Sequence, residues 1–245
     1  PFPPNKGDKI RSFHLLRHLS ARYDIHLGAF VDDPDDWQYR DALTPWCKSI
    51  KLLPLNPRRA KLASLVGLLT SEALTLPYYR NHELARWADE LAASGTVTRG
   101  LAFSSAMAQF MPASLSRRVL DMVDVDSDKW AQYAPTQRWP LSWVYAREGR
   151  KLAEWEARVA QDFDATLLVS RDEAALLQQR VPQARHKIGA FENGVDAEYF
   201  SPARDYPNPY PAEVQGVVFT GAMDYWPNID AVTWFAERIF PAVRD

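Results

Sequence analysis

The densest group of residues that could do chemistry is the acidic run between residues 121 and 128. Asp124 and Asp126 come at the end of an apolar segment, 117–124, which predicts a buried strand. Ligands of open parallel sheets collect at the carboxyl ends of the strands. We therefore predict that Asp124 and Asp126 line a cleft and hydrogen-bond a substrate hydroxyl. The alternative is that they only cap a helix near Ser127.

A second group of charged residues surrounds Gly7. Prolines at positions 1, 3 and 4 exclude a helix there, whereas Gly7 can adopt a positive φ and Asp8 is a suitable N-cap. The sequence thus predicts a sharp turn at Gly7 that leads into a helix. Unpaired N–H groups at a helix N-terminus attract phosphate or carboxylate, and Lys6, Lys9 and Arg11 add positive charge. We predict an anion-binding loop, with an ordinary capped surface helix as the alternative.

The other reactive side chains form no catalytic or metal-binding motif. His14 and His18 share a helix face, but the sequence offers no third ligand nearby. Cys47 is the single cysteine, which excludes an internal disulfide and a cysteine-based zinc site. The pair Ser104-Ser105 lacks the glycines that flank a hydrolase nucleophile. We therefore expect neither a bound metal ion nor a cofactor.

The composition is that of a folded protein without bulk charge. The chain has 245 residues, of which 47% are hydrophobic, and a net charge of −2. This length fits one large domain or one and a half ordinary ones. The near-neutral charge gives no reason to expect nucleic acid as a partner. The low cysteine content fits a reducing cytoplasm.

Apolar runs and helical patterns alternate along most of the chain without hairpin signals. The runs are continuously apolar, which is typical of parallel strands covered on both faces. We therefore predict an α/β fold with a Rossmann-like parallel sheet and helices on both faces. Strands are expected at 23–31, 49–53, 97–103, 117–124, 165–170 and 187–191, and helices at 37–46, 81–93, 141–163 and 172–179.

The helix predicted from residue 56 has an unusual distribution of side chains. Arg58, Arg59 and Lys61 lie at its start, and leucines on a broad apolar face follow. Such a helix suits docking on an anionic membrane surface. Burial in the core or between domains is the simpler interpretation.

A change of composition marks a domain boundary. Residues 201–211 contain four prolines, which predicts an extended linker. We assign residues 1–200 to a first domain, 201–215 to the linker and 216–245 to the start of a second domain. That second part is expected to contain the first βα unit of another Rossmann-like domain, a strand at 216–221 and a helix at 228–242.

Three segments resemble glycosyltransferases of family 4, which have the two-domain GT-B fold. The loop with Gly7, Asp8 and Arg11 resembles the start of the subgroup found in exopolysaccharide and PEP-CTERM gene clusters. The segment Asn193-Gly-Val-Asp-Ala-Glu-Tyr-Phe-Ser-Pro is similar to the junction between the two domains. The segment Val218-Phe-Thr-Gly-Ala-Met-Asp-Tyr-Trp-Pro-Asn is similar to the opening of the donor-binding domain.

The resemblance implies a metal-independent, retaining transfer of a sugar from a nucleotide-diphosphate sugar to a glycan or lipid-linked acceptor. Gly7, Asp8, Arg11 and Gly221 would approach the donor, Asn193 and Gly194 would join the domains, and the protein would work in the cytoplasm, in peripheral contact with the inner membrane face. Ala222 stands where many members have a basic residue. The family's first strand is expected before Pro1, and its donor-binding lysine and glutamates after residue 245, so this stretch alone is expected to be inactive.

Two other functions fit the same architecture. A nucleotide-sugar epimerase would require an acid/base pair in the cleft, which the histidines do not offer. A non-catalytic sugar-binding module would require none. Asp124-Val-Asp126 is also similar to the Asp-x-Asp of metal-dependent glycosyltransferases, but three residues are a weak signal. An unpaired strand at 217–220 predicts that the chain self-associates.

Overall fold

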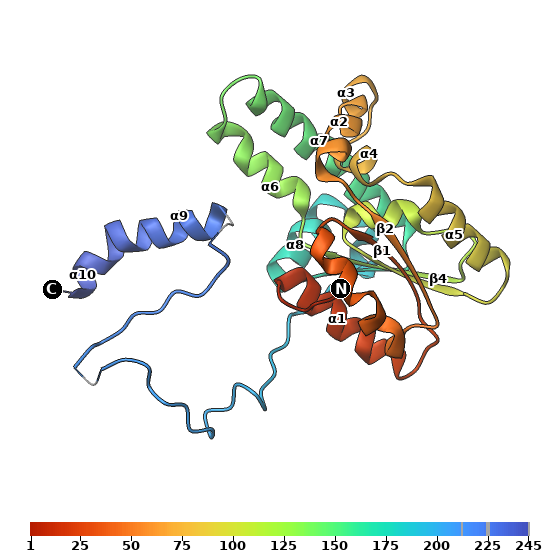
Figure 1. The fold of residues 1–245 in the computed structure, drawn as a ribbon. Helices are drawn as coiled ribbons and strands as arrows, with labels where there is room; N and C mark the ends of the chain where they lie inside the picture. The colour runs from red at the N-terminus through yellow and green to blue at the C-terminus, as the bar shows by residue number, and fades with distance from the viewer. Residues whose placement is uncertain (212, 224–225, 245) are drawn as a thin grey trace. The chain divides into compact units, whose positions relative to one another are not determined.

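The computed structural model describes residues 1–211, 213–223 and 226–244 (Figure 1). The chain divides into two compact units, Pro1–Gly194 and Val195–Asp245. The first unit therefore ends close to residue 200, where we placed the end of the first domain from the sequence.

All strands of the described residues lie in the first unit, and all of them pair in parallel. β1 (His26–Val31) pairs with β2 (Ser49–Pro54) in a separate two-stranded sheet. In the described residues no strand pairing joins β1 to the larger sheet. The fold is α/β with parallel sheets, consistent with the predicted Rossmann-like arrangement. The larger sheet contains, side by side in chain order, β3 (Arg99–Phe103), β4 (Arg117–Val123), β5 (Ala165–Leu168) and β6 (Ile188–Ala190).

Helical segments connect the strands. α1 (Gly7–Ser20) precedes β1, α5 (His82–Ala93) precedes β3 and the long α7 (Leu141–Asp162) precedes β5, which confirms the three helices predicted there. The shorter segments of the first unit are η1 (Pro34–Trp46), α2 (Pro57–Ser64), α3 (Val66–Leu69), α4 (Thr75–Tyr79), η2 (Ser105–Phe110), α6 (Asp126–Tyr133), η3 (Ala134–Thr136), α8 (Arg171–Arg180) and η4 (Pro182–Lys187).

The segment expected as an α-helix at 37–46 is the 3-10 helix η1. It begins at Pro34, where the side chain of Asp33 accepts a hydrogen bond from the amide of Asp35 (3.0 Å). Pro45 lies inside it and has no N–H to donate to an α-helical carbonyl. The 3-10 helix does not require that hydrogen bond to the carbonyl four residues earlier, because its own hydrogen bonds join residues three positions apart.

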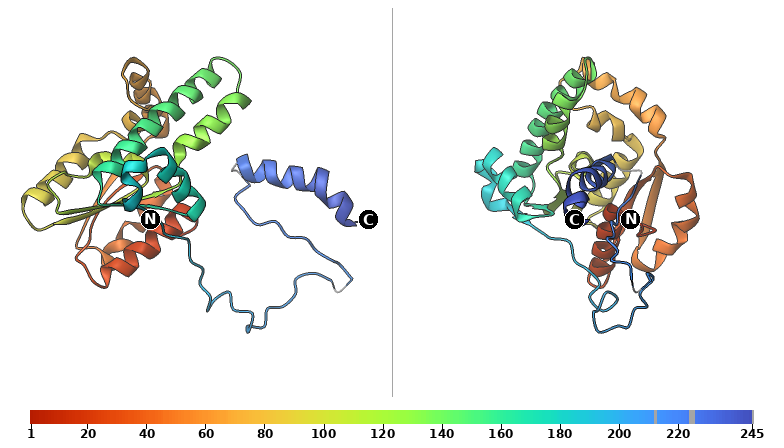
Figure 2. Two further views of the ribbon diagram at one scale, coloured as in Figure 1. Left: turned by 180° about the vertical axis from the view of Figure 1, so that it is seen from behind. Right: turned by 90° about the vertical axis from the view of Figure 1, so that its left-hand side faces the viewer.

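Helices cover both faces of the larger sheet. Along β4, Leu120 and Met122 point to one face and Asp121 to the other, and all three are buried. Leu120 and Met122 share the main core cluster with Val159 of α7. Asp121 instead forms an ion pair with Arg11 of α1. α1 and α7 thus lie on opposite faces, below and above the sheet in Figure 1 and in the left view of Figure 2.

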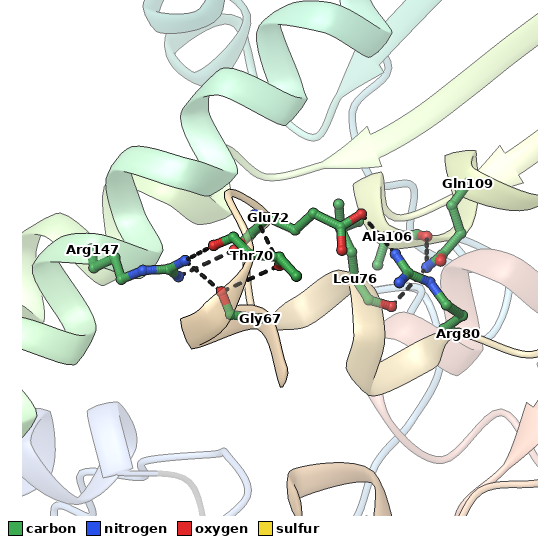
Figure 3. A network of polar contacts seen from close by, with 8 residues as sticks. All are labelled: Gly67, Thr70, Glu72, Leu76, Arg80, Ala106, Gln109 and Arg147. Carbon is green, nitrogen blue, oxygen red and sulfur yellow. Dashed lines mark hydrogen bonds and ion pairs between the residues drawn. The ribbon is translucent and has the colours of Figure 1, made fainter. Parts of the chain in front are cut away.

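A buried arginine of α7 holds the end of α3 (Figure 3). The guanidinium of Arg147 donates hydrogen bonds to the carbonyl oxygens of Gly67 (2.5 Å), Thr70 (2.7 Å) and Glu72 (3.1 Å). These carbonyls lie at or just after the C-terminus of α3, where they have no partner within the helix. Glu72 also pairs with Arg80 at 2.8 Å, so the same network continues to the end of α4.

The next residue of α7, Glu148, holds the start of α4. Its carboxylate accepts hydrogen bonds from the amides of Leu74 (2.6 Å) and Thr75 (2.9 Å) and from the Thr75 hydroxyl (2.6 Å). Arg147 and Glu148 therefore fix the whole connection between α3 and α4 to the long helix.

The second unit contains helices but no strand among its described residues. The predicted strand at 216–221 is wrong, because residues 216–220 form no ladder with any described neighbour. The predicted helix at 228–242 is confirmed as the consecutive segments α9 (Trp226–Trp234), η5 (Phe235–Ile239) and α10 (Phe240–Arg244). Residues 201–211 and 213–215 contain neither helix nor strand, as expected of the linker.

Candidate functional site

β3 and β4 both end in strained backbone at one edge of the sheet. Ser104 follows β3 with a φ of 78°, and Val123 ends β4 with a φ of 72°. A β-branched residue rarely adopts a positive φ, and such strain concentrates at functional sites. The amide of Asp124 donates to the carbonyl oxygen of Met122 (3.0 Å), which closes a γ-turn around Val123. This turn redirects the chain where the acidic run begins.

The structure brings the predicted Asp124 and Asp126 together on one cation. Lys129 Nζ lies 2.6 Å from Asp124 Oδ2 and 3.4 Å from Asp126 Oδ1. The capping alternative is wrong, because the N-cap position of α6 is Val125 and the Ser127 amide donates to Glu156 and to neither aspartate. Both carboxylates therefore lie at the carboxyl end of β4, and neither of them caps α6.

Burial changes the proton affinity of this group. It raises the pKa of Asp126, although the charge and hydrogen bond of Lys129 oppose the shift. Burial lowers the pKa of Lys129, but its hydrogen bond to Asp124 and the charges of both carboxylates outweigh that effect and raise it. The cluster thus combines a firmly protonated ammonium with a carboxylate that binds a proton more readily than usual.

The start of α6 is anchored by Glu156, a residue that sequence reasoning missed. The Glu156 carboxylate accepts hydrogen bonds from the amide of Ser127 (3.0 Å) and from its hydroxyl. Burial raises the pKa of Glu156 to about 7. The signal was present in its spacing, because Glu156 lies four residues after Leu152 and three before Val159 on the buried face of α7.

Tyr79 lies among carboxylates from three separate segments. Burial, followed by the neighbouring Tyr78, raises its pKa, and the charges of Asp32, Asp126 and Asp8 raise it further. Asp32 follows β1, Asp126 begins α6 and Asp8 lies in the first turn of α1. Charges from the end of β1 and from the starts of α1 and α6 thus all raise the pKa of this one tyrosine.

Arg11 is buried and fully engaged within the protein. Its Nε and Nη2 donate to the two carboxylate oxygens of Asp121, each at 2.9 Å, and its Nη1 donates to Asn193 Oδ1 at 2.8 Å. The guanidinium also lies over the ring of Phe191, 4.8 Å from the centroid. Arg11 therefore joins α1, β4 and the segment after β6. Its contact with a donor diphosphate stays a prediction.

The backbone around Gly7 differs from the expectation. The helix begins at Gly7 directly after a bend at Lys6, as predicted, but Gly7 is absent from the described residues with a positive φ. The N-cap position belongs to Lys6 and not to Asp8, which lies in the first turn. There its negative charge stabilises the positive helix end and competes with an external anion.

No turn forms at the junction residues Asn193 and Gly194. Neither Asn193 nor Gly194 is among the described residues with a positive φ. The turn instead forms at Asp196, whose carboxylate accepts from the Tyr199 amide (2.8 Å) and whose carbonyl accepts from the Phe200 amide (2.9 Å).

The predicted donor-binding Gly221 lies in the second unit, outside any strand. A Cβ at this position would approach the side-chain amide nitrogen of Asn228 to 2.8 Å. That amide donates to the carbonyl oxygen of Ala222 at 3.0 Å. Gly221 therefore permits a close contact between the loop and the start of α9.

An aromatic pocket lies between the helices α6 and α7. It adjoins Asp124, Asp126 and Lys129, which we call the acidic cluster. Its volume is about 340 Å³, and it is lined by Asp126, Lys129, Trp130, Tyr133 and Tyr145. The rings of Trp130 and Tyr145 meet edge to face, with centroids 4.8 Å apart. Small-molecule sites typically combine such apolar walls with a few polar groups, in volumes of about 300 to 1,000 Å³. Sequence reasoning missed this pocket, although Trp130 and Tyr133 are one helical turn apart.

Within the described ranges, no three His, Cys, Asp or Glu side chains lie close enough to hold a metal ion. None of the described helices is long and apolar enough to cross a membrane.

No family model, no curated protein and no solved structure matches the chain. The resemblance to family 4 glycosyltransferases therefore rests on the three short segments alone, and the function has to be argued from the site.

Proposed function

We propose that this chain is the acceptor-side part of a glycosyltransferase. The enzyme would transfer a sugar from a nucleotide-diphosphate sugar to a hydroxyl of a glycan or lipid-linked acceptor, with retention and without a metal ion. One observation carries the proposal: Asp124 and Asp126 lie at the carboxyl end of a parallel strand, beside a pocket lined by aromatic rings. Parallel sheets bind their substrates at this edge.

The pocket suits a sugar ring of the acceptor. The C–H groups on the face of a pyranose are apolar and can cover an aromatic ring, whereas its hydroxyls need polar partners. Trp130 and Tyr145 offer the ring surfaces, and Asp126 and Lys129 offer an acceptor and a donor of hydrogen bonds at the same wall. In the proposed reaction Asp126 and Asp124 hydrogen-bond the attacking hydroxyl.

On the first unit, the donor would be held by groups near α1. The leaving nucleotide diphosphate gains negative charge in the transition state, which preorganised N–H groups and cations stabilise. The first turn of α1 offers such N–H groups, with Lys6 exposed beside them. The predicted donor contacts of Gly7, Asp8, Arg11 and Gly221 belong to this part of the proposal.

The proposed place of action is the cytoplasm, at the inner face of the membrane, in exopolysaccharide synthesis. This follows from the resemblance of the N-terminal loop and from the expected lipid-linked acceptor.

The test is a transfer assay on the product of the whole gene. A panel of uridine, guanosine and thymidine diphosphate sugars is incubated with oligosaccharide or polyprenyl-phosphate-linked acceptors, and the released nucleoside diphosphate is measured. We expect acceptor-dependent release from one donor class and an unchanged anomeric configuration in the product. Conversion of a nucleotide sugar without an acceptor would instead favour the epimerase.

A further inference from the structure

Four large apolar side chains project into solvent from α2 and α3. Leu62 is 71% exposed, Leu65 50%, Val66 49% and Leu69 89%. Their spacing places them on one helix face, and the backbone at Leu65 stays helical (φ −60°, ψ −22°), so the face continues from α2 into α3. We call these four residues the α2–α3 ridge. The predicted burial of this helix is thus wrong for its largest side chains.

The inward face of the same helices is made of small residues. Ala60, Ser64 and Gly67 are buried there. A Cβ on Gly67 would lie 3.0 Å from a side-chain carbon of Leu74 and 3.4 Å from Pro77, so α3 approaches α4 closely. A helix on the surface of a water-soluble protein normally has the opposite arrangement, with its large apolar residues facing the core.

The outward direction of the ridge is fixed from within. Arg147 binds three carbonyl oxygens around the end of α3 (Figure 3). Glu148 binds the first amides of α4. Both side chains are buried in the first unit. The hydrogen bonds of these two side chains therefore hold α3, and with it the exposed leucines, in a fixed position on the first unit.

Basic residues accompany the ridge. Arg58, Arg59 and Lys61 are all exposed, and the sequence has no acidic residue from position 56 to position 71. Arg58 and Arg59 lie in the first turn of α2, where positive charge is unfavourable to the helix dipole. The charges of Arg58 and Arg59 therefore do not stabilise the helix, whereas they would attract an external anion.

A second apolar group lies at the same end of the first unit. Trp139 is 82% exposed, Leu141 50% and Trp143 54%, where α6 turns into α7, and Arg138 beside them is also exposed. We call Trp139, Leu141 and Trp143 the hairpin tip. The α6–α7 turn and α2–α3 both lie at the top in Figure 1 and in both views of Figure 2. Tryptophan is the residue most typical of membrane interfaces, together with tyrosine.

We propose that the α2–α3 ridge and the hairpin tip together dock this protein on an anionic phospholipid surface. The leucines and tryptophans would enter the interface between headgroups and acyl chains, and Arg58, Arg59, Lys61 and Arg138 would bind lipid phosphates. A second copy of the chain is a poorer occupant, because a two-fold interface would bring the same basic residues against one another. The inference deepens the proposed function by naming the surface that meets the membrane, and rests on it only for the lipid-linked acceptor.

The test is flotation of the purified protein with vesicles, without donor or acceptor. We expect binding to vesicles of phosphatidylglycerol and phosphatidylcholine, and weak binding to phosphatidylcholine alone. Arg58→Gln/Arg59→Gln should weaken the partition coefficient about 25-fold, at about fivefold per charge. The matched control is Arg17→Gln/Arg22→Gln, which removes the same charge from exposed positions on and just after α1 and should change binding less than twofold.

The apolar part is tested by Leu62→Ser/Leu69→Ser, which keeps every charge and should also lower binding at least tenfold. Circular dichroism confirms that each variant is folded. Equal binding to neutral and anionic vesicles, or an equal loss in the control, would overturn the inference. A dimer in light scattering that Leu69→Ser dissociates would assign the ridge to a second copy. Because no sugar is present, either outcome leaves the proposed transferase reaction to its own assay.

Discussion

Glu156 shows at the residue scale how burial sets a proton equilibrium beside the candidate site. Its carboxylate is nearly inaccessible and bonded to Ser127, the second residue of α6. The folded protein binds its proton more tightly than the unfolded chain, because burial raises the pKa from 4.5 to about 7. Between these two values the unfolded state loses the proton first, so the free energy of unfolding falls as pH rises and levels off above about pH 7.

We predict that Glu156→Gln removes this dependence on pH. The amide has nearly the same shape and no proton to lose near neutral pH. Relative to the wild type, the free energy of unfolding of the variant should rise by about 3 kcal/mol between pH 4.5 and pH 8. Urea unfolding at both pH values measures it. Glu154→Gln, on the exposed side of the same helix, is the control, and an equal response of both variants would contradict the account.

The sequence predicts individual site residues unevenly. The place of Asp124 and Asp126 directly after a strand could be predicted, because an apolar run followed by acidic residues is a local pattern. The pairing of Arg11 with Asp121 could not be found, since the two residues are 110 positions apart and meet only across the sheet. The N-cap positions predicted at Asp8 and Asp126 are wrong, because a shift of one or two residues in the start of a helix changes which side chain can cap it.

At the scale of elements, Arg147 connects α7 with α3 and with the segment that leads from α3 to α4. We predict that Arg147→Met loosens this connection, because three carbonyl oxygens lose a charged donor and the cost is about 3 kcal/mol. Amide hydrogen exchange within 66–79 should become at least tenfold faster.

The control for that prediction is Arg150→Met, which changes an exposed arginine of the same helix and should leave these rates unaltered. Faster exchange spread equally over β4 and β5 would show that the residue supports the whole core, contrary to the local role assigned to it.

Elements with a strong local pattern were predicted well. α7, α5 and β4 lie within a few residues of their predicted positions. The segment 216–220 is as apolar as the true strands but lacks a hydrogen-bonded neighbour in the described chain, and a parallel strand exists only through its partners. The ridge residues fit a helix pattern equally well inside or outside the core, since periodicity defines a face without saying what covers it.

At the scale of the whole molecule, exposed apolar side chains predict that the chain associates with itself. Val217 and Val218 are 58% and 60% exposed in a segment without strand partners. We predict that the chain self-associates with rising concentration and that Val218→Lys reduces the association, because a charge there opposes the burial of this apolar segment between chains. Light scattering after size-exclusion chromatography measures this. Val195→Lys, at another exposed valine of the same unit, should have no effect, and a monomeric wild type at high concentration would contradict the prediction.

The central claim is that the acidic cluster after β4 serves sugar transfer, and its most direct test is the rate of acceptor-dependent nucleoside diphosphate release by the whole gene product. Asp126→Asn keeps the shape of the side chain and removes its charge next to the acceptor pocket. We predict a loss of about 100-fold or more in turnover, with the exposed Asp172→Asn as an unaffected control. Full turnover by Asp126→Asn would contradict the account.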